Sequence, residues 1–201
     1  MKSAPAAVTD AILDLVLHAP TTTEQALQDP RVRAHKIGRA AARKASLMSG
    51  TMSLPPGMLG WLTVLPELIG VWRLQAQMVS DLSAVYGQRA SLGREQMLYC
   101  LFKHVSAQLL RDVVVRVGER VVLREASLKM LQSLAQQLGV HVTKAMLSRS
   151  ASRFVPLLGA MGVGAYAYFD TMQVAKNAME LFGHGPNVES TPATSPTKKI
   201  D

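Results

Sequence analysis

The feature that most constrains the fold is a stripe of small residues near the C-terminal end of the chain. No charged residue occurs between Arg153 and Asp170. From this stretch onward, small residues recur at steps of three and four: Ala160, Gly164, Ala167, Thr171, Ala175 and Ala178. That spacing matches the α-helical repeat, so all of them fall on one edge of a single helix. Because small side chains let a second backbone come close, we expect this edge to be buried against another helix.

Most of the remaining chain also shows helical periodicity. The patterns predict helices over residues 66–86, 93–117, 123–138 and 140–152, with glycines at 87, 118 and 139 as their ends. Gln75 falls on the apolar face of the first of these helices and would need a buried partner. The valine-rich runs 113–115 and 121–123 are too short to predict a sheet. We therefore predict an all-α fold, an irregular multi-helix bundle with a buried Gly/Ala-rich C-terminal helix.

The sequence divides into three parts. Residues 1–50 predict a basic helical leader, residues 51–183 an apolar helical core domain, and residues 184–201 a tail rich in Pro, Ser and Thr. A length of 201 residues suits one domain with appendages. The tail has too few apolar residues to offset its ordering entropy, so we expect it to be disordered.

Positive charge is concentrated in the leader. The chain has a net charge of +8, and the segment 31–44 contains six basic residues and no acidic one. The basic residues are Arg31, Arg33, Lys36, Arg39, Arg43 and Lys44. Such a segment attracts an anionic membrane surface, nucleic acid or an acidic partner. No aromatic residue precedes Trp61, which disfavours nucleic acid. We expect a membrane or partner surface here, and the alternative is a solvated helix that simply packs on the core.

No catalytic or metal-binding pattern is visible. Cys100 and His104 stand four residues apart on one predicted helix face, as a nucleophile and its base could. Their neighbours are apolar, so we interpret both as core or boundary residues. The five histidines show no metal-ligand spacing. We therefore expect no cofactor, no metal and no enzymatic activity.

The chain shows no segment that predicts secretion or a membrane span. Asp10 and Asp14 interrupt the apolar N-terminal stretch, which a signal peptide would not tolerate. The uncharged run 154–169 would be about 24 Å long as a helix, whereas a span needs roughly 20 residues. The single cysteine excludes an internal disulfide and suits a reducing compartment. These features predict a cytoplasmic protein, associated at most with the membrane surface.

Several short motifs resemble those of a known family. The first block contains Pro56-Gly57, Leu62-Thr63, Pro66-Glu67-Leu68, Gln75 to Val79 and Tyr86-Gly87. The second contains the glycine cluster 159–164, Tyr168-Phe169 and the Ala-rich run to Phe182. Together, residues 54–182 resemble the EcsC family. This resemblance implies a bacterial, all-helical protein whose founding relative is encoded beside the components of an ABC transporter linked to secretion. It implies no catalytic residues.

These observations lead to two functional hypotheses. The first is a non-enzymatic accessory protein bound peripherally to the bacterial inner membrane or to a transport or secretion complex. The alternative is a soluble helical module that binds an apolar ligand, such as a fatty acid, in a core lined by Met, Leu and Gly.

Overall fold

The computed structural model describes residues 3–52, 60–105, 108–110, 114–117, 120–123, 126–150 and 156–183. The N-terminal helices are α1 (Ala4–Leu17), α2 (Arg31–Met52) and α3 (Gly60–Val85), followed by a short 3-10 turn, η1 (Arg89–Ser91). Then come α4 (Arg94–Phe102), β1 (Val114–Val117), β2 (Arg120–Leu123), α5 (Leu128–Ser150) and α6 (Pro156–Gly183). The predicted all-α multi-helix fold is confirmed, with one short β-hairpin added to it.

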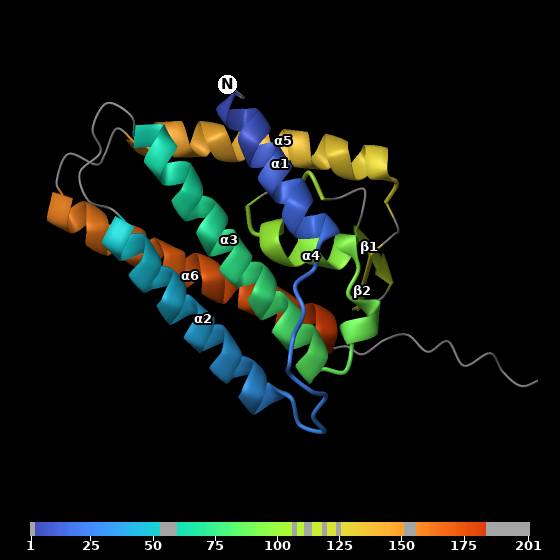
Figure 1. Ribbon diagram of the computed structural model, residues 1–201. Coiled ribbons are helices and arrows are strands. Elements are labelled where there is room, and N and C mark those ends of the chain that lie inside the picture. The colour runs from blue at the N-terminus through green and yellow to red at the C-terminus, as the bar shows by residue number, and fades with distance from the viewer. Residues whose placement is uncertain are drawn as a thin grey trace, which may run out of the picture.

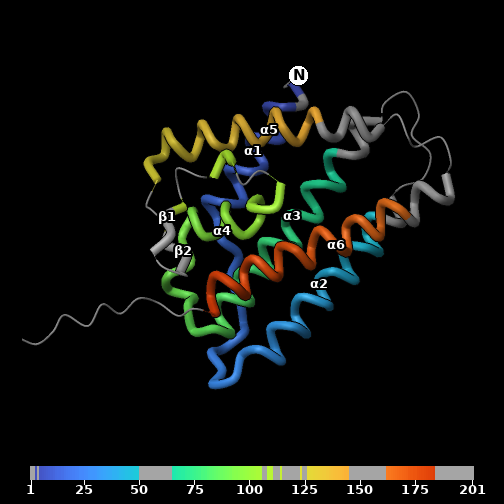
Figure 2. Tube along the Cα trace, turned by 180° about the vertical axis from the view of Figure 1, so that it is seen from behind, coloured from blue at the N-terminus to red at the C-terminus, as the bar shows by residue number. Residues whose placement is uncertain are grey.

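Three long helices form one side of the molecule. Helices α2, α3 and α6 run side by side, and α5 lies across the opposite side (Figures 1 and 2). Helix α1 packs mainly against α5, and it also contacts α3 and α4. Helix α4 fills the space between α1, α3 and α6. Among the residues that the structure describes, no helix is long and apolar enough to cross a membrane.

The small-residue edge of α6 is buried, and its main neighbour is α2. The buried small residues on α6 are Gly164, Ala167, Thr171, Ala175 and Ala178. Helix α2 buries small residues of its own: Ala34, Gly38, Ala41, Ala42 and Ala45. A Cβ atom built on Gly38 would stand only 3.0 Å from the Cβ of Ala175. The two backbones therefore approach closely because both helices present small side chains. The side chain of Ala160 lies outside the described part.

Both N-terminal helices contribute to the main hydrophobic core. Val8 and Ile12 of α1 and Ala34 of α2 belong to the same buried cluster as Leu82 of α3 and Leu98 of α4. Trp72 and Phe102 meet edge to face, with ring centroids 5.3 Å apart, and join α3 to α4. The first fifty residues thus help to form the core on which the later helices pack.

Helix α5 differs from the two helices that the sequence predicts over 123–138 and 140–152. It runs without interruption through Gly139, so the expected break there is wrong. A Cβ at position 139 would stand 2.5 Å from Thr9 Oγ1 and 3.1 Å from the carbonyl oxygen of Pro5. The absence of a side chain at Gly139 therefore lets the backbone of α1 pass close to α5. A glycine costs a helix about 1 kcal/mol relative to alanine, and the close α1–α5 contact accounts for its presence.

The helix predicted over 93–117 is also wrong in its second half. Helix α4 ends at Phe102, and residues 114–117 instead pair antiparallel with residues 120–123 in register Val115↔Val122. The valine-rich runs therefore form a hairpin, because β-branched side chains favour strands. Val114 and Leu123 pack against the core from this hairpin.

Helix α3 begins earlier than the predicted start at Pro66 and contains that proline within it. Its C-terminal end is as expected, because Gly87 has a φ of +72°, which favours glycine. The N–H groups of Gly87 and Gln88 donate to the carbonyls of Ala84 and Ser83 at 2.9 and 2.7 Å. This pattern is a Schellman motif, and it satisfies the last carbonyls of α3. Residues 53–59 and the predicted tail 184–201 lie outside the described residues.

Candidate functional site

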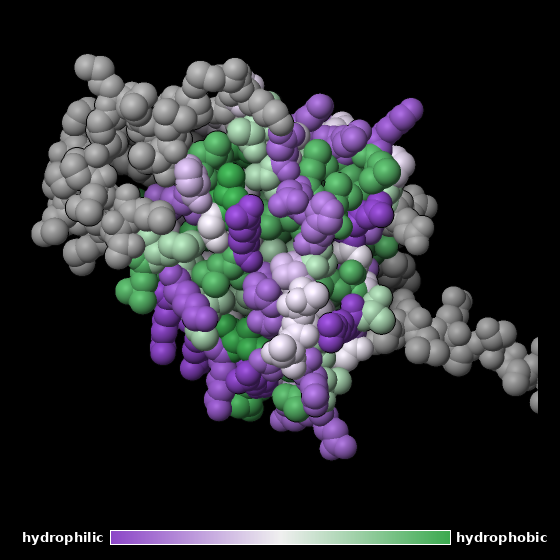
Figure 3. All heavy atoms as spheres, viewed as in Figure 1, coloured by the Kyte–Doolittle hydropathy of each residue, from purple (hydrophilic) through white to green (hydrophobic). Residues whose placement is uncertain are grey.

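All six basic residues expected to form a binding surface lie on α2. Each of the six side chains is exposed. In Figure 3, hydrophilic side chains project from the lower left of the molecule, where Figure 1 places α2. Helix α2 contains no acidic residue along its 22 positions. Its inner face is fixed by the small-residue contacts with α6, so the basic side chains must point outward.

Acidic residues lie close to the N-terminal end of this face. The guanidinium Nε of Arg33 donates to Glu24 Oε2 at 3.0 Å, and a second guanidinium nitrogen donates to Glu24 Oε1. This hydrogen bonding holds the pKa of Glu24 below its ordinary value. Asp29 accepts the backbone N–H of Arg31 at 3.4 Å. The charge of Arg33 is therefore largely offset by the carboxylate of Glu24.

The uncompensated charge lies further along α2. Within the described ranges, Lys36, Arg39, Arg43 and Lys44 take part in no ion pair. Arg39 and Arg43 are four residues apart, and like charges at that spacing destabilise a helix by about 0.2–0.5 kcal/mol. An anion placed against them would relieve this repulsion. We call these four residues the cationic face of α2.

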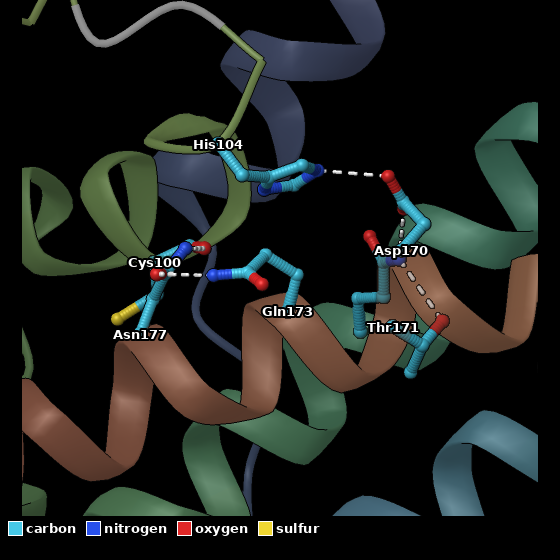
Figure 4. Close-up of polar contacts among 7 residues, drawn as sticks. Cys100, His104, Asp170, Thr171, Gln173 and Asn177 are labelled. Atoms are coloured by element: carbon cyan, nitrogen blue, oxygen red, sulfur yellow. Dashed lines mark hydrogen bonds and ion pairs between the residues drawn. The ribbon is translucent and has the colours of Figure 1, made fainter.

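A cluster of hydrogen-bonded polar side chains, the internal polar cluster, lies inside the bundle, between α3, α6 and the chain that follows α4 (Figure 4). Asp170 Oδ1 lies 2.8 Å from His104 Nε2. Its other oxygen, Oδ2, accepts a hydrogen bond from Gln75 Nε2 at 2.8 Å, and the same nitrogen lies 3.1 Å from Thr171 Oγ1. The predicted need of Gln75 for a buried partner is confirmed. One carboxylate on α6 therefore joins α3 to the segment after α4.

Asn177 continues these contacts along α6. Its Nδ2 donates to the backbone carbonyl of Cys100 at 3.3 Å. The last carbonyls of a helix have no partner within that helix, and Cys100 stands in the last turn of α4. Asn177 therefore caps α4 from a neighbouring helix. Gln173 Nε2 lies 3.5 Å from Asn177 Oδ1 and orients that amide.

Cys100 and His104 do not share a helix face, contrary to the prediction from their spacing. Helix α4 ends at Phe102, so His104 lies in the turn beyond it and pairs with Asp170. In Figure 4 the sulfur of Cys100 points away from the imidazole of His104. The thiol is fully buried, and burial raises its pKa well above the ordinary value. A reactive cysteine has a lowered pKa and an accessible sulfur, so this environment favours an inert thiol.

The internal polar cluster is therefore best explained as a set of hydrogen bonds that hold α3, α4 and α6 together. Thr171 and Asn177 are as deeply buried as the apolar core. In the described part of the chain, no three His, Cys, Asp or Glu side chains lie close enough together to hold a metal ion. The sequence identified Gln75 from its position on an apolar face. It could not identify Asp170 as the partner of His104, because 66 residues separate them.

Comparison of the chain with protein-family models, with curated proteins and with solved structures finds no match. The resemblance of residues 54–182 to the EcsC family stays a prediction.

Proposed function

We propose that this protein is a helical accessory protein that binds the anionic surface of a membrane peripherally, through the cationic face of α2. The observation that supports this function is the exposure of Lys36, Arg39, Arg43 and Lys44 on one helix that has no acidic residue. Each basic residue near an anionic leaflet contributes about 1 kcal/mol to binding. The resemblance to the EcsC family suggests the bacterial inner membrane as that surface.

The shape of the face favours a membrane over nucleic acid. Helix α2 is long and lies on the outside of the bundle (Figure 1). Its exposed basic side chains therefore form an extended cationic surface, which suits a layer of headgroups. Nucleic-acid binding proteins usually add aromatic side chains or a known reading motif to such charge. The exposed part of α2 offers Val32 and Ala40 among its cations and Leu47 beyond the last of them, and it carries no Phe, Tyr or Trp.

Co-sedimentation with vesicles tests this proposal. The purified protein is mixed at low salt with phosphatidylcholine vesicles that contain or lack phosphatidylglycerol. We expect sedimentation only with the anionic vesicles. A variant with Lys36→Gln, Arg39→Gln, Arg43→Gln and Lys44→Gln should bind up to about a thousandfold more weakly, since four cations contribute about 4 kcal/mol.

A matched control removes positive charge elsewhere. Arg89, Lys129 and Lys144 are exposed and lie outside α2. Changing all three to Gln should leave most of the binding in place, because the protein can still place α2 on the vesicle. If this control loses as much binding as the α2 variant, net charge rather than the face determines binding. Equal sedimentation with neutral vesicles, or none with anionic vesicles, would contradict the proposed function.

A further inference from the structure

Two of the most exposed aliphatic side chains lie on α2. Val32 is 61% exposed near the start of the helix, and Leu47 is 70% exposed near its end. At 100° per residue, both fall on the same line of the helix as Lys36, Arg39 and Arg43, within an arc of about 80°. The outermost line of α2 thus has a cationic middle and an aliphatic residue toward each end.

The distances along this line suit a helix that lies flat on a surface. Val32 and Leu47 are about 22 Å apart along the axis at 1.5 Å per residue. The opposite side of the helix is buried against α6 and α3 by small residues, so α2 can present this line without leaving the bundle.

We propose that α2 binds the membrane surface with its axis parallel to the bilayer plane, an inference that rests on the proposed function. Lys36, Arg39 and Arg43 then contact headgroup phosphates, while Val32 and Leu47 both enter the boundary between headgroups and acyl chains. Helices that lie in the membrane interface combine the same two interactions, shallow burial of apolar side chains and attraction of basic residues to anionic lipids. An anionic lipid leaflet is the partner that fits this line of α2, because its phosphates can bind the cationic middle and its acyl chains can bury the aliphatic ends.

An environment-sensitive fluorophore tests this orientation. Val32→Cys and Leu47→Cys are labelled separately with a nitrobenzoxadiazole maleimide, with Gln136→Cys on α5 as a control. The native Cys100 is fully buried and should not react in the folded protein. With anionic vesicles, we expect a blue shift and a gain in emission at positions 32 and 47, and no change at position 136.

The outcomes separate this inference from the proposed function. If the labelled proteins sediment with the vesicles but the probes at 32 and 47 report water, the orientation is wrong while the membrane function stands. A shift at only one of the two positions would also overturn a parallel helix. Failure to sediment at all would contradict the proposed function itself.

Affinity provides a second readout that does not depend on a label. Val32→Ser combined with Leu47→Ser should weaken vesicle binding about tenfold, as expected for two partly inserted aliphatic side chains. Leu128→Ser is the matched control, because Leu128 is 54% exposed at the start of α5. Equal binding by the α2 double variant and the Leu128→Ser control would contradict insertion.

Discussion

The thiol of Cys100 is an internal probe of the core. Its sulfur is enclosed by packed side chains of the bundle, and this burial raises its pKa. In the unfolded chain a cysteine ionises near pH 8.5. Above that pH the unfolded state loses the proton and the folded state keeps it. The contribution of the Cys100 thiol to the free energy of unfolding is therefore fully present below the pKa that the thiol has in the unfolded chain. It is lost as the pH rises toward the pKa that the thiol has in the folded protein.

We therefore expect the free energy of unfolding to fall by about 1.4 kcal/mol per pH unit above pH 8.5 through this residue alone. Urea unfolding of the wild type and of Cys100→Ala at about pH 8 and about pH 10 measures the difference. The wild type should lose more stability than Cys100→Ala over this interval. Identical losses would show that the thiol titrates normally and is not enclosed as described.

Asp170 connects α6 to α3 and to the turn after α4 through one carboxylate. Both of its oxygens are engaged, one by His104 and one by Gln75. In Asp170→Asn the charge-assisted hydrogen bonds of the carboxylate are lost, and the new N–H₂ group can donate to His104 Nε2 only if the imidazole changes tautomer, so we expect a loss of about 1–3 kcal/mol. Thermal unfolding measures this loss.

Asp14→Asn is the control for the charge change in Asp170→Asn. Asp14 also pairs with a histidine, His18, but both side chains are more than half exposed. Exposed ion pairs contribute about 0–1 kcal/mol, so the Asp14 variant should unfold near the wild-type temperature. An Asp170 variant that is as stable as the Asp14 variant would contradict the role given to the internal contacts.

At the scale of the elements, two glycines on α5 and α6 should respond in opposite ways to the same substitution. Gly139→Ala would place a methyl group against the carbonyl of Pro5 and the side chain of Thr9, so we expect a loss of about 1–3 kcal/mol. Gly162 has no atom within 4 Å of an added Cβ. Gly162→Ala should therefore stabilise α6 by up to about 1 kcal/mol. If melting curves show the same sign for both, the close α1–α5 packing is wrong.

The contact between α2 and α6 gives a related prediction. An added Cβ at Gly38 already stands 3.0 Å from Ala175, so a larger side chain must push α2 away from α6. Gly38→Leu should lower the melting temperature clearly or prevent soluble expression. Ala40→Leu is the control, since Ala40 is exposed on the same helix. Equal melting temperatures for the two leucine variants would argue against a close backbone approach.

The helices were predictable where periodicity and composition agree. The small-residue pattern predicts a long C-terminal helix, and α6 is that helix, with its small edge packed mainly against α2. The sequence could not reveal which backbone it meets, because Gly38 and Ala175 are far apart in the chain. A glycine between two helical patterns predicts a helix end, which is how Gly139 was interpreted. The helix continues there because the backbone of α1 passes beside this position, and the sequence does not show that contact. The hairpin was missed because valine runs of three residues are compatible with either a strand or a buried helix.

The sequence likewise predicted one part of the candidate site, the basic surface, and not the contacts between distant residues. The density of Lys and Arg in residues 31–44 identified the basic surface from sequence. It could not reveal that Glu24 binds Arg33, because the eight intervening positions carry no pattern that predicts how the chain turns between them. The His104–Asp170 pair depends entirely on how α4 ends and where α6 crosses it.

For the whole molecule, α2 combines two separate tasks on opposite faces. Its inner face contributes small residues to the core, and its outer face carries four uncompensated cations. Substitutions on the outer face should therefore change binding while the fold persists. The salt dependence of vesicle binding tests this division, since the energy of exposed charges is screened over a Debye length of about 10 Å at 0.1 M salt.

The most direct measurement is the apparent Kd for anionic vesicles at about 0.03 M and about 0.3 M salt. The wild type should bind at least about tenfold more weakly at the higher salt, because roughly four cations contribute about 1 kcal/mol each. The variant with all four residues of the cationic face changed to Gln should bind weakly at both concentrations and unfold at or above the wild-type temperature. Binding of the wild type that is independent of salt, or a four-residue variant that binds as tightly as the wild type, would contradict the account.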